Sequence, residues 1–331
     1  MRELIIEKPE LQIFLNLIQK RGITVSYPLY NMDLLKAEVY DDGYRIKVLA
    51  SEKNFRDFLK DRKEFLEELP TYRDFRECFL ASGIIRYDNV DEFLERLELY
   101  KGLTKGVVFA PDTNVLYHSF ISNFKPLKGY EIIIVDLVKK EIENSMNFKY
   151  RPADIKALRR VLYHGELLNE FYNKRKMKSR KAAYIALKEF DKLKDRAIEV
   201  ESVKEEARTN DELIVKTLKK FDQENAPLTI LLTADIAMTD IAKLEGVEHF
   251  LFEYPHGELD ELFAAPHQLR ALLFNLAAVF GVIQINRAYL FGEFRGKAKL
   301  NELKMLLRGE YEEMKFHLEI CRKIMGLKIK K

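Results

Sequence analysis

An acidic residue follows each of two apolar stretches that have the composition of buried strands. Asp112 comes just after residues 107–110, and Asp235 comes just after residues 229–232. Both stretches are short and uninterrupted, and a helical pattern follows each acid. Because the carboxyl ends of parallel strands share one edge of a sheet, we expect these two carboxylates to lie close together.

Three further acids occupy related positions near the starts of predicted helices. Glu141 lies in a helical pattern that follows the apolar stretch 132–135, and Asp211 opens an amphipathic helical pattern. Helices that begin at the carboxyl edge of a sheet bring such side chains to the same place as the strand-end acids. Asp240, in the helical pattern after residue 235, is a fifth candidate.

A cluster of this kind favours one class of chemistry. Carboxylates a few ångströms apart repel one another, which raises their pKa values, and a divalent cation removes that cost. Hard oxygen ligands suit Mg²⁺ or Mn²⁺, whereas zinc sites usually contain His or Cys, which these positions lack. A metal bound in this way can activate water and stabilise the charge that builds on a phosphodiester.

Each acid taken singly has a simpler explanation as a helix cap. Asp112, Thr113 and Asn114 are all favourable N-cap residue types, and capping requires no further function. For any single acid we consider capping the better explanation. The repeated placement of acids at strand–helix junctions favours a shared site, and capping by the same residues is compatible with it.

The pattern around these acids predicts an α/β fold. Apolar strands at residues 107–110, 132–135, 229–232 and 250–252 alternate with helical segments. This alternation is typical of a parallel sheet covered by helices on both faces. None of these strands is followed by a Gly-rich dinucleotide fingerprint or a P-loop, so neither usual nucleotide-phosphate cradle is supported.

Composition restricts the cellular setting. The chain has 331 residues, is 47% hydrophobic and carries a formal net charge of +3. Cys78 and Cys321 are its only cysteines, which excludes a disulfide framework and indicates a reducing cytoplasm. The first 22 residues lack the apolar core of a signal peptide, and no apolar run approaches the ~20 residues of a membrane helix. We therefore expect a cytoplasmic protein that has no membrane partner.

The segment from about residue 105 to 255 resembles the PIN-domain nucleases. Four short motifs carry the resemblance: FAPDTNVL, IVDLVKKEIE, NDELIVKTL and LLTADIAMTDIAK. The resemblance implies a parallel sheet between helices, RNA cleavage with Mg²⁺ or Mn²⁺, and products with a 5′-phosphate and a 3′-hydroxyl. The implied catalytic and metal-binding acids are Asp112, Glu141, Asp211 and Asp235, with Asp240 as a further candidate ligand, and the implied supporting residues are Thr113, Asn114 and Thr233.

The regions outside these motifs are large. We expect an α+β domain of unassigned role at 1–104, the PIN-like domain at 105–256, and a mainly helical C-terminal region at 257–331. Residues 1–105 contain 18 basic and 20 acidic side chains and no catalytic pattern, which favours a protein partner or a homo-oligomer contact there. A toxin role is disfavoured, because the small toxins of this family lack such flanking segments.

A basic helical insertion is expected at residues 146–200. Residues 146–196 contain 15 basic and 6 acidic side chains, with tyrosines and a phenylalanine interleaved. Cations neutralise phosphates and aromatic rings stack on unpaired bases, so we expect nucleic-acid contact; the alternative is a solvated helical face. The expected contact residues are Lys174, Arg175, Lys176, Lys178, Arg180 and Lys181.

These observations lead to a metal-dependent endoribonuclease as the first hypothesis. One alternative is a nucleic-acid-binding or assembly module with weak or no nuclease activity, which the large flanking regions favour. Another is a structure-specific DNA nuclease, because no residue in the sequence identifies a contact to the 2′-hydroxyl that distinguishes RNA.

Overall fold

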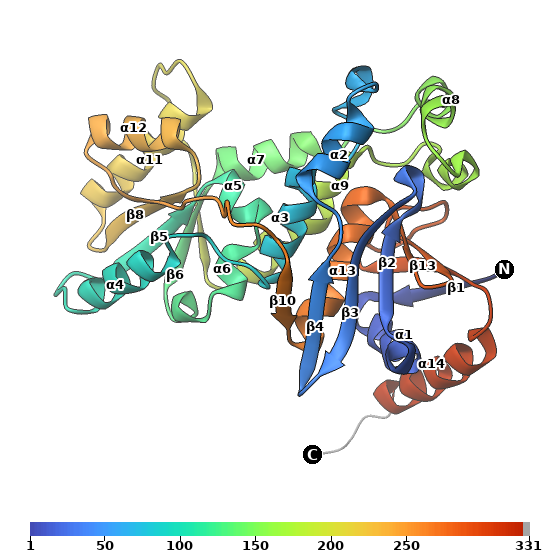
Figure 1. Cartoon of the computed structure of the whole chain (residues 1–331). Helices are drawn as coiled ribbons and strands as arrows, with labels where there is room; N and C mark the ends of the chain where they lie inside the picture. Colours follow the sequence, from blue (N-terminus) through green and yellow to red (C-terminus); the bar gives the residue numbers. More distant parts are fainter. Residues whose placement is uncertain (327–331) are drawn as a thin grey trace. The chain divides into compact units, whose positions relative to one another are not determined.

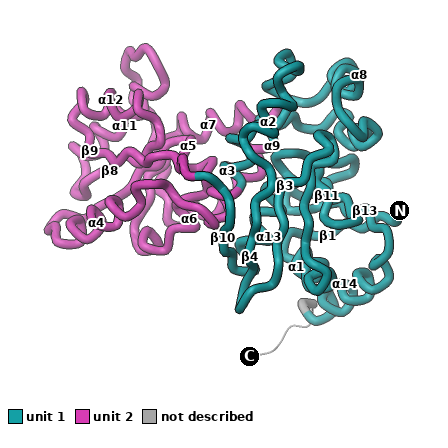
Figure 2. The backbone as a smooth tube through the Cα atoms, in the orientation of Figure 1, with its two compact units in different colours: residues 1–78, 148–180, 258–331 teal, residues 79–147, 181–257 magenta. Residues whose placement is uncertain are grey.

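The computed structural model describes residues 1–326, which form two compact units (Figure 2). Unit 1 comprises Met1–Cys78, Phe148–Arg180 and the chain from Glu258 onward, and unit 2 comprises Phe79–Asn147 and Lys181–Gly257. None of the helices within residues 1–326 is both long enough and apolar enough to cross a membrane.

Unit 2 contains a five-stranded parallel sheet with the order β7-β6-β5-β8-β9. The four predicted strands are confirmed. The fifth strand, β7, was not predicted, because its sequence AIEV is short and half polar. The strands are β5 (Val107–Pro111), β6 (Glu131–Val135), β7 (Ala197–Val200), β8 (Leu228–Thr233) and β9 (Glu248–Leu251).

Helices lie on both sides of this sheet (Figure 1). This arrangement confirms the predicted α/β architecture of a parallel sheet between helices. The main helices of unit 2 are α4 (Val90–Lys101), α5 (Thr113–Tyr117), α6 (Phe120–Asn123), α7 (Asp136–Ser145), a π-helical turn (Ala182–Ala186), α10 (Leu187–Leu193), α11 (Asn210–Glu224) and α12 (Ile236–Glu245).

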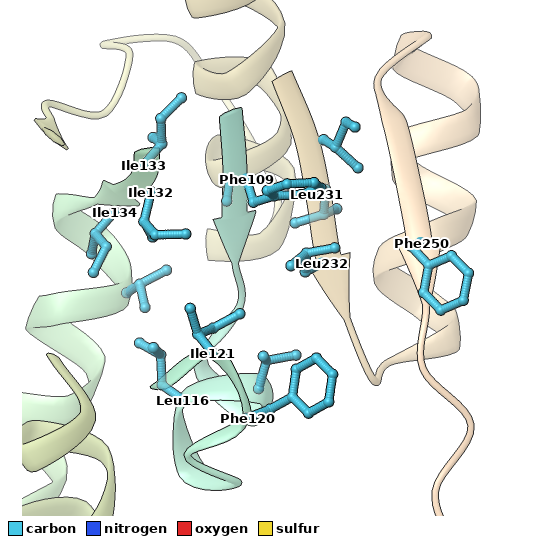
Figure 3. Close-up of a cluster of buried hydrophobic side chains, with 14 of the residues drawn as sticks. Phe109, Leu116, Phe120, Ile121, Ile132, Ile133, Ile134, Leu231, Leu232 and Phe250 are labelled. Atoms are coloured by element: carbon cyan, nitrogen blue, oxygen red, sulfur yellow. The ribbon is translucent and has the colours of Figure 1, made fainter. Parts of the chain in front are cut away.

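The core of unit 2 explains why its strands are so apolar. Ile132, Ile133 and Ile134 are consecutive in β6 and all three are fully buried, so both faces of the strand are covered. Figure 3 shows labelled side chains of this core from β5, β6, β8 and β9 together with others from α5 and α6. Burying each such large apolar side chain contributes about 1.5–3 kcal/mol, which fixes the strand ends on which the candidate acids depend.

Unit 1 contains an eight-stranded antiparallel sheet with the order β1-β13-β12-β11-β2-β3-β4-β10. The strands are β1 (Arg2–Glu7), β2 (Ile23–Tyr27), β3 (Met32–Tyr40), β4 (Gly43–Val48), β10 (Glu261–Ala264), β11 (Val282–Ile285), β12 (Ala288–Phe291) and β13 (Glu302–Leu307). The helices that begin in this unit are α1 (Leu11–Ile18), α2 (Glu52–Leu59), α3 (Tyr72–Ser82), α8 (Pro152–Val161), α9 (Met177–Lys181), α13 (Pro266–Phe280) and α14 (Tyr311–Gly326).

This sheet corrects the expected division of the chain. Residues 1–104 and 257–331 were expected to form separate regions, but their strands interleave: β11 pairs with β2, and β1 pairs with β13. The C-terminal region is therefore not mainly helical. Pairing between strands far apart in sequence leaves no local signal, whereas the hairpin of β3 and β4 has one in its tight turn at Asp41, Asp42 and Gly43.

Two local expectations also change. In the C-terminal region, which was expected to be mainly helical, residues 302–326 form β13, then a turn, then α14. Gly309 lies in that turn with φ of +92°, a conformation that favours glycine and ends the preceding strand. The expected insertion 146–200 is divided, because residues 148–180 belong to unit 1 and residues 181–200 belong to unit 2.

Candidate active site

The strand order of unit 2 places a topological switch point at the carboxyl ends of β5 and β8. From β5 the chain continues to β6 and β7 on one side of the central strand, and it then crosses to β8 and β9 on the other side. In such a sheet the crevice at the topological switch point is the usual place for a site. Pro111 is paired with Leu232, which brings the following residues, Asp112 and Thr233, side by side.

Asp112 is held by hydrogen bonds to both of its carboxylate oxygens. Only 3% of the residue is exposed. Oδ1 accepts a bond of 2.7 Å from the Val115 N–H, which makes Asp112 the N-cap of α5. Oδ2 accepts bonds from the Thr233 hydroxyl at 2.5 Å and from the Asn114 amide at 3.4 Å. The capping role considered from the sequence is therefore confirmed, and it occupies one of the two oxygens.

Thr233 connects the two strand-end acids. While its hydroxyl donates to Asp112, the same oxygen accepts a bond of 2.9 Å from the backbone N–H of Asp235. Asp235 is itself the N-cap of α12, because its Oδ1 accepts from the Ala237 N–H at 2.8 Å. Thr233 is fully buried, so this connection is shielded from water.

Glu141 is joined to the same region through Thr113. Thr113 is the first residue of α5, and its hydroxyl donates to Glu141 Oε2 at 2.7 Å. Glu141 is an exposed residue of α7, the helix that follows β6. The bond between them links the helices that follow two adjacent strands.

Asp211 lies in the first turn of α11 and is electrostatically coupled to two of the other acids. Thr209 caps this helix by accepting a bond from the Glu212 N–H at 3.2 Å. Partial burial raises the pKa of Asp211, and the negative charges of Asp235 and Glu141 raise it further. Asp235 and Glu141 are therefore close enough to Asp211 for their charges to influence its carboxylate.

The donor set fits a hard divalent cation. Burial raises the pKa of Asp112 from 3.8 to about 6, although hydrogen bonds to its carboxylate act in the opposite direction. Ionising Asp112 and Asp211 is therefore costly unless a positive charge compensates. Carboxylate oxygens are the ligands that Mg²⁺ and Mn²⁺ prefer. As the side chains stand, no three acidic, His or Cys residues within 1–326 are grouped closely enough to hold a metal ion.

Comparison with known families agrees with this geometry. Residues 109–252 match the PIN domain family. The match spans the parallel sheet of unit 2, from Phe109 in β5 to the end of β9. PIN domains are generally nucleases and typically use divalent metals, so the family and the carboxylate site indicate the same class of chemistry. No curated protein matches the chain.

The remaining predicted residues of the PIN domain lie in two different settings. Asn114 is exposed and donates to Asp112, as a supporting residue would. Asp240 is five residues beyond Asp235, which places it about 140° around α12. Its side chain is 67% exposed and pairs with Lys243 at 3.8 Å. The structure therefore gives Asp240 the position of a solvated surface charge.

Arg180 corrects the expected nucleic-acid contact. Only 1% of this residue is exposed. Its guanidinium donates to the carbonyls of Arg175, Ala278 and Val279 at 2.9 Å each. Arg180 is therefore committed to the packing of unit 1, and a burial of this extent prevents contact with a phosphate.

Lys176 is also committed to unit 1. Its ammonium pairs with Glu68 and with Asp154, the latter at 3.2 Å. Lys178 is exposed, and Lys174, Arg175 and Lys181 are partly exposed. The residues that keep the exposure needed for a nucleic-acid contact are Lys174, Arg175, Lys178 and Lys181.

Some supporting contacts had no signal in the sequence. Asp136 is the first residue of α7, and its side chain accepts a bond of 2.9 Å from the Ser202 N–H. That bond tethers the segment after β7. Glu189 is fully buried and accepts bonds from the backbone and hydroxyl of Ser122. It lies in a charge-rich helix, so nothing in the sequence distinguishes it from a surface acid.

Proposed function

We propose that this protein is a Mg²⁺- or Mn²⁺-dependent endoribonuclease whose site lies at the carboxyl ends of β5 and β8. The observation that carries the proposal is the shared hydroxyl of Thr233, which binds the Asp112 carboxylate and the Asp235 backbone. This bond holds the two strand-end acids together at a switch point. The PIN domain match adds the chemical class, nucleic-acid hydrolysis.

The metal would be held by Asp112, Asp211 and Asp235, with Glu141 as a further ligand or as the group that orients the attacking water. When bound, such an ion supplies an activated water and offsets charge on the phosphodiester oxygens.

The protein's own contribution is orientation. The Val115 N–H and the Thr233 hydroxyl fix the Asp112 carboxylate, and the Thr113 hydroxyl fixes one oxygen of Glu141. Groups positioned in this way need no rearrangement when charge develops in the reaction, which is the main source of electrostatic catalysis. We expect products with a 5′-phosphate and a 3′-hydroxyl, and we propose the cytoplasm as the location, since two cysteines in 331 residues provide no disulfide framework.

Cleavage of end-labelled RNA tests the proposal. Wild-type protein with Mn²⁺ should produce internal cuts, and digestion of the fragments by a 5′-phosphate-dependent exonuclease identifies the ends. Asp112→Asn and Asp235→Asn should lose at least about 100-fold in rate. Asp240→Asn is the matched control, because it makes the same chemical change on an exposed acid of the same helix. Wild-type rates in both site variants would rule out the assignment.

The same assay separates the alternatives. Equal or faster cleavage of branched or single-stranded DNA would make the protein a DNA nuclease at the same site. No cleavage of either polymer, together with no increase in melting temperature on adding Mn²⁺, would favour a binding or assembly module.

A further inference from the structure

Charge is distributed unequally between the two units. Of the 56 basic and 53 acidic side chains, unit 1 contains 37 and 27, and unit 2 contains 19 and 26. Unit 1 is therefore at +10 and unit 2, which carries the carboxylate site, is at −7. A unit with excess negative charge repels a polyanion, so the attraction for nucleic acid must come from unit 1.

The excess positive charge of unit 1 is concentrated in residues 148–180. This segment contains 10 basic and 3 acidic side chains. Two of those acids are already engaged within unit 1: Asp154 pairs with Lys176, and Glu170 pairs with Lys304 at 3.0 Å. The segment therefore presents positive charge that its own acids do not neutralise.

Helix α8 presents part of that charge to solvent. Ile155 and Leu158 are buried and attach the helix, while Lys156, Arg159 and Arg160 are exposed. Lys156 and Arg160 are four residues apart, so their like charges are neighbours on the surface, which destabilises a helix by itself. Neither forms an ion pair within the described part of the chain. Figure 2 shows α8 at the periphery of unit 1.

An exposed aromatic ring follows this helix and is held in place. The Arg62 guanidinium donates to the Val161 carbonyl at 2.8 Å, which caps the C-terminal end of α8. Tyr163 packs against Phe58 with ring centroids 6.3 Å apart, yet 52% of the tyrosine remains exposed. A ring supported on one side and open on the other suits stacking on an unpaired base.

A second exposed ring lies beside another pair of like charges. Residues 148–150 pair with residues 174–176, with Lys149 directly opposite Arg175. Phe148, the neighbouring residue, is 57% exposed.

We propose that these residues form a binding surface for single-stranded nucleic acid. The surface, termed the α8 face, consists of Phe148, Lys149, Lys156, Arg159, Arg160 and Tyr163. The inference rests on the proposed nuclease function, and it assigns substrate recruitment to unit 1 and chemistry to the PIN domain. Cations contact the phosphates, and the aromatic rings stack on bases that are not paired in a duplex.

Binding of fluorescent oligouridine, oligothymidine and duplex RNA to the full chain in EDTA tests the proposal, because no cleavage occurs without metal. Lys156→Gln/Arg160→Gln should weaken single-strand binding about tenfold at moderate salt. It should also reduce the slope of log affinity against log salt by about 1.4. Tyr163→Ala should weaken binding by about tenfold, and Tyr163→Phe should restore it.

Lys125→Gln/Lys128→Gln is the matched control. It removes the same charge from exposed lysines of unit 2 that precede β6, at the opposite end of the strands from the acids. Unchanged binding by the α8 variant, an equal loss in the control, or equal affinity for duplex and single strand would each overturn the proposal. Binding to both oligouridine and oligothymidine supports single-strand recognition without sugar discrimination.

The experiments distinguish a failure of this proposal from a failure of the nuclease proposal. Binding that depends on the α8 face without metal-dependent cleavage would refute the nuclease and leave the α8 face. Metal-dependent cleavage by the wild type, together with normal binding by the α8 variant, would support the nuclease and refute the α8 face.

Discussion

The Thr233 hydroxyl and the Asp112 carboxylate are joined by a buried hydrogen bond of 2.5 Å. Asp112 follows the central strand β5 and Thr233 ends its neighbour β8, so this bond joins the two strands at the carboxyl edge of the sheet. The bond also orients Asp112 Oδ2, while Oδ1 accepts the hydrogen bond that caps α5.

Thr233→Val should therefore weaken catalysis while preserving the shape of the core. Removing a side chain that orients a metal ligand typically costs about 10–100-fold in metal affinity or activity. Thr233→Ser keeps the hydroxyl and should retain most of the activity. Single-turnover cleavage rates across a Mn²⁺ series provide the measurement. Equal rates for the Val and Ser variants would show that the bond does not matter.

Asp112→Asn should make the metal-free protein more stable at neutral pH, although it removes activity. The pKa of the Asp112 carboxyl is raised from 3.8 to about 6, so its ionised form disfavours the folded state by up to about 3 kcal/mol. This penalty is fully present above the folded-state pKa of about 6 and shrinks as pH falls, until it is absent below 3.8, where the carboxyl is protonated in both states.

Urea unfolding in EDTA at pH 7.5 and pH 4.5 measures this difference. The advantage of the Asn variant should be largest at pH 7.5 and should shrink at pH 4.5. A variant that is less stable than wild type at pH 7.5 would contradict the idea that Asp112 is held at an energetic cost for function.

Arg180→Met should destabilise unit 1 rather than weaken nucleic-acid binding directly. The buried guanidinium satisfies three backbone carbonyls, and leaving them unpaired costs about 3 kcal/mol or more. Lys178→Met, two residues away and exposed, is the matched control and should change stability by less than ~0.5 kcal/mol. Thermal melts of the two variants compare the effects directly, and equal melting temperatures would refute the packing role.

Lys297 should make the stability of the protein depend on alkaline pH. Burial lowers the pKa of its ammonium to about 7, with the charges of Arg175 and Lys174 acting in the same direction. Between pH 7 and 10 the unfolded chain therefore binds more protons than the folded chain, and stability rises with pH. Relative to wild type, Lys297→Met should have its greatest stability advantage near pH 7 and lose it toward pH 10. A pH-independent difference would contradict this assignment.

The candidate site was easier to predict than the fold that surrounds it. Asp112 and Asp235 follow continuous apolar strands, and this pattern can be recognised from neighbouring residues alone. The single sheet of unit 1 was not predictable, because the sequences of strands such as β1 and β13 do not indicate which distant strand each one pairs with. Strand β13, with the sequence ELKMLL, was mistaken for part of a helix because its charges also fit a helical surface.

The basic run shows a second limit of sequence reasoning. Lys178 and Arg180 have the same charge and lie two positions apart, yet one is exposed and the other is almost fully buried. Burial depends on carbonyls at residues 278 and 279, a hundred positions away, that no local pattern reveals. The charge of the run was informative, but the assignment of individual contacts required the structure.

The most direct test of the central claim is the RNA cleavage rate as a function of Mn²⁺ concentration for wild type, Asp235→Asn and Asp240→Asn. We expect a saturable dependence for wild type and for the Asp240 variant. Asp235→Asn should require far more Mn²⁺ or show no cleavage. Cleavage that persists in EDTA, or an Asp235 variant with the wild-type dependence, would contradict a metal site built on the acids at the ends of β5 and β8.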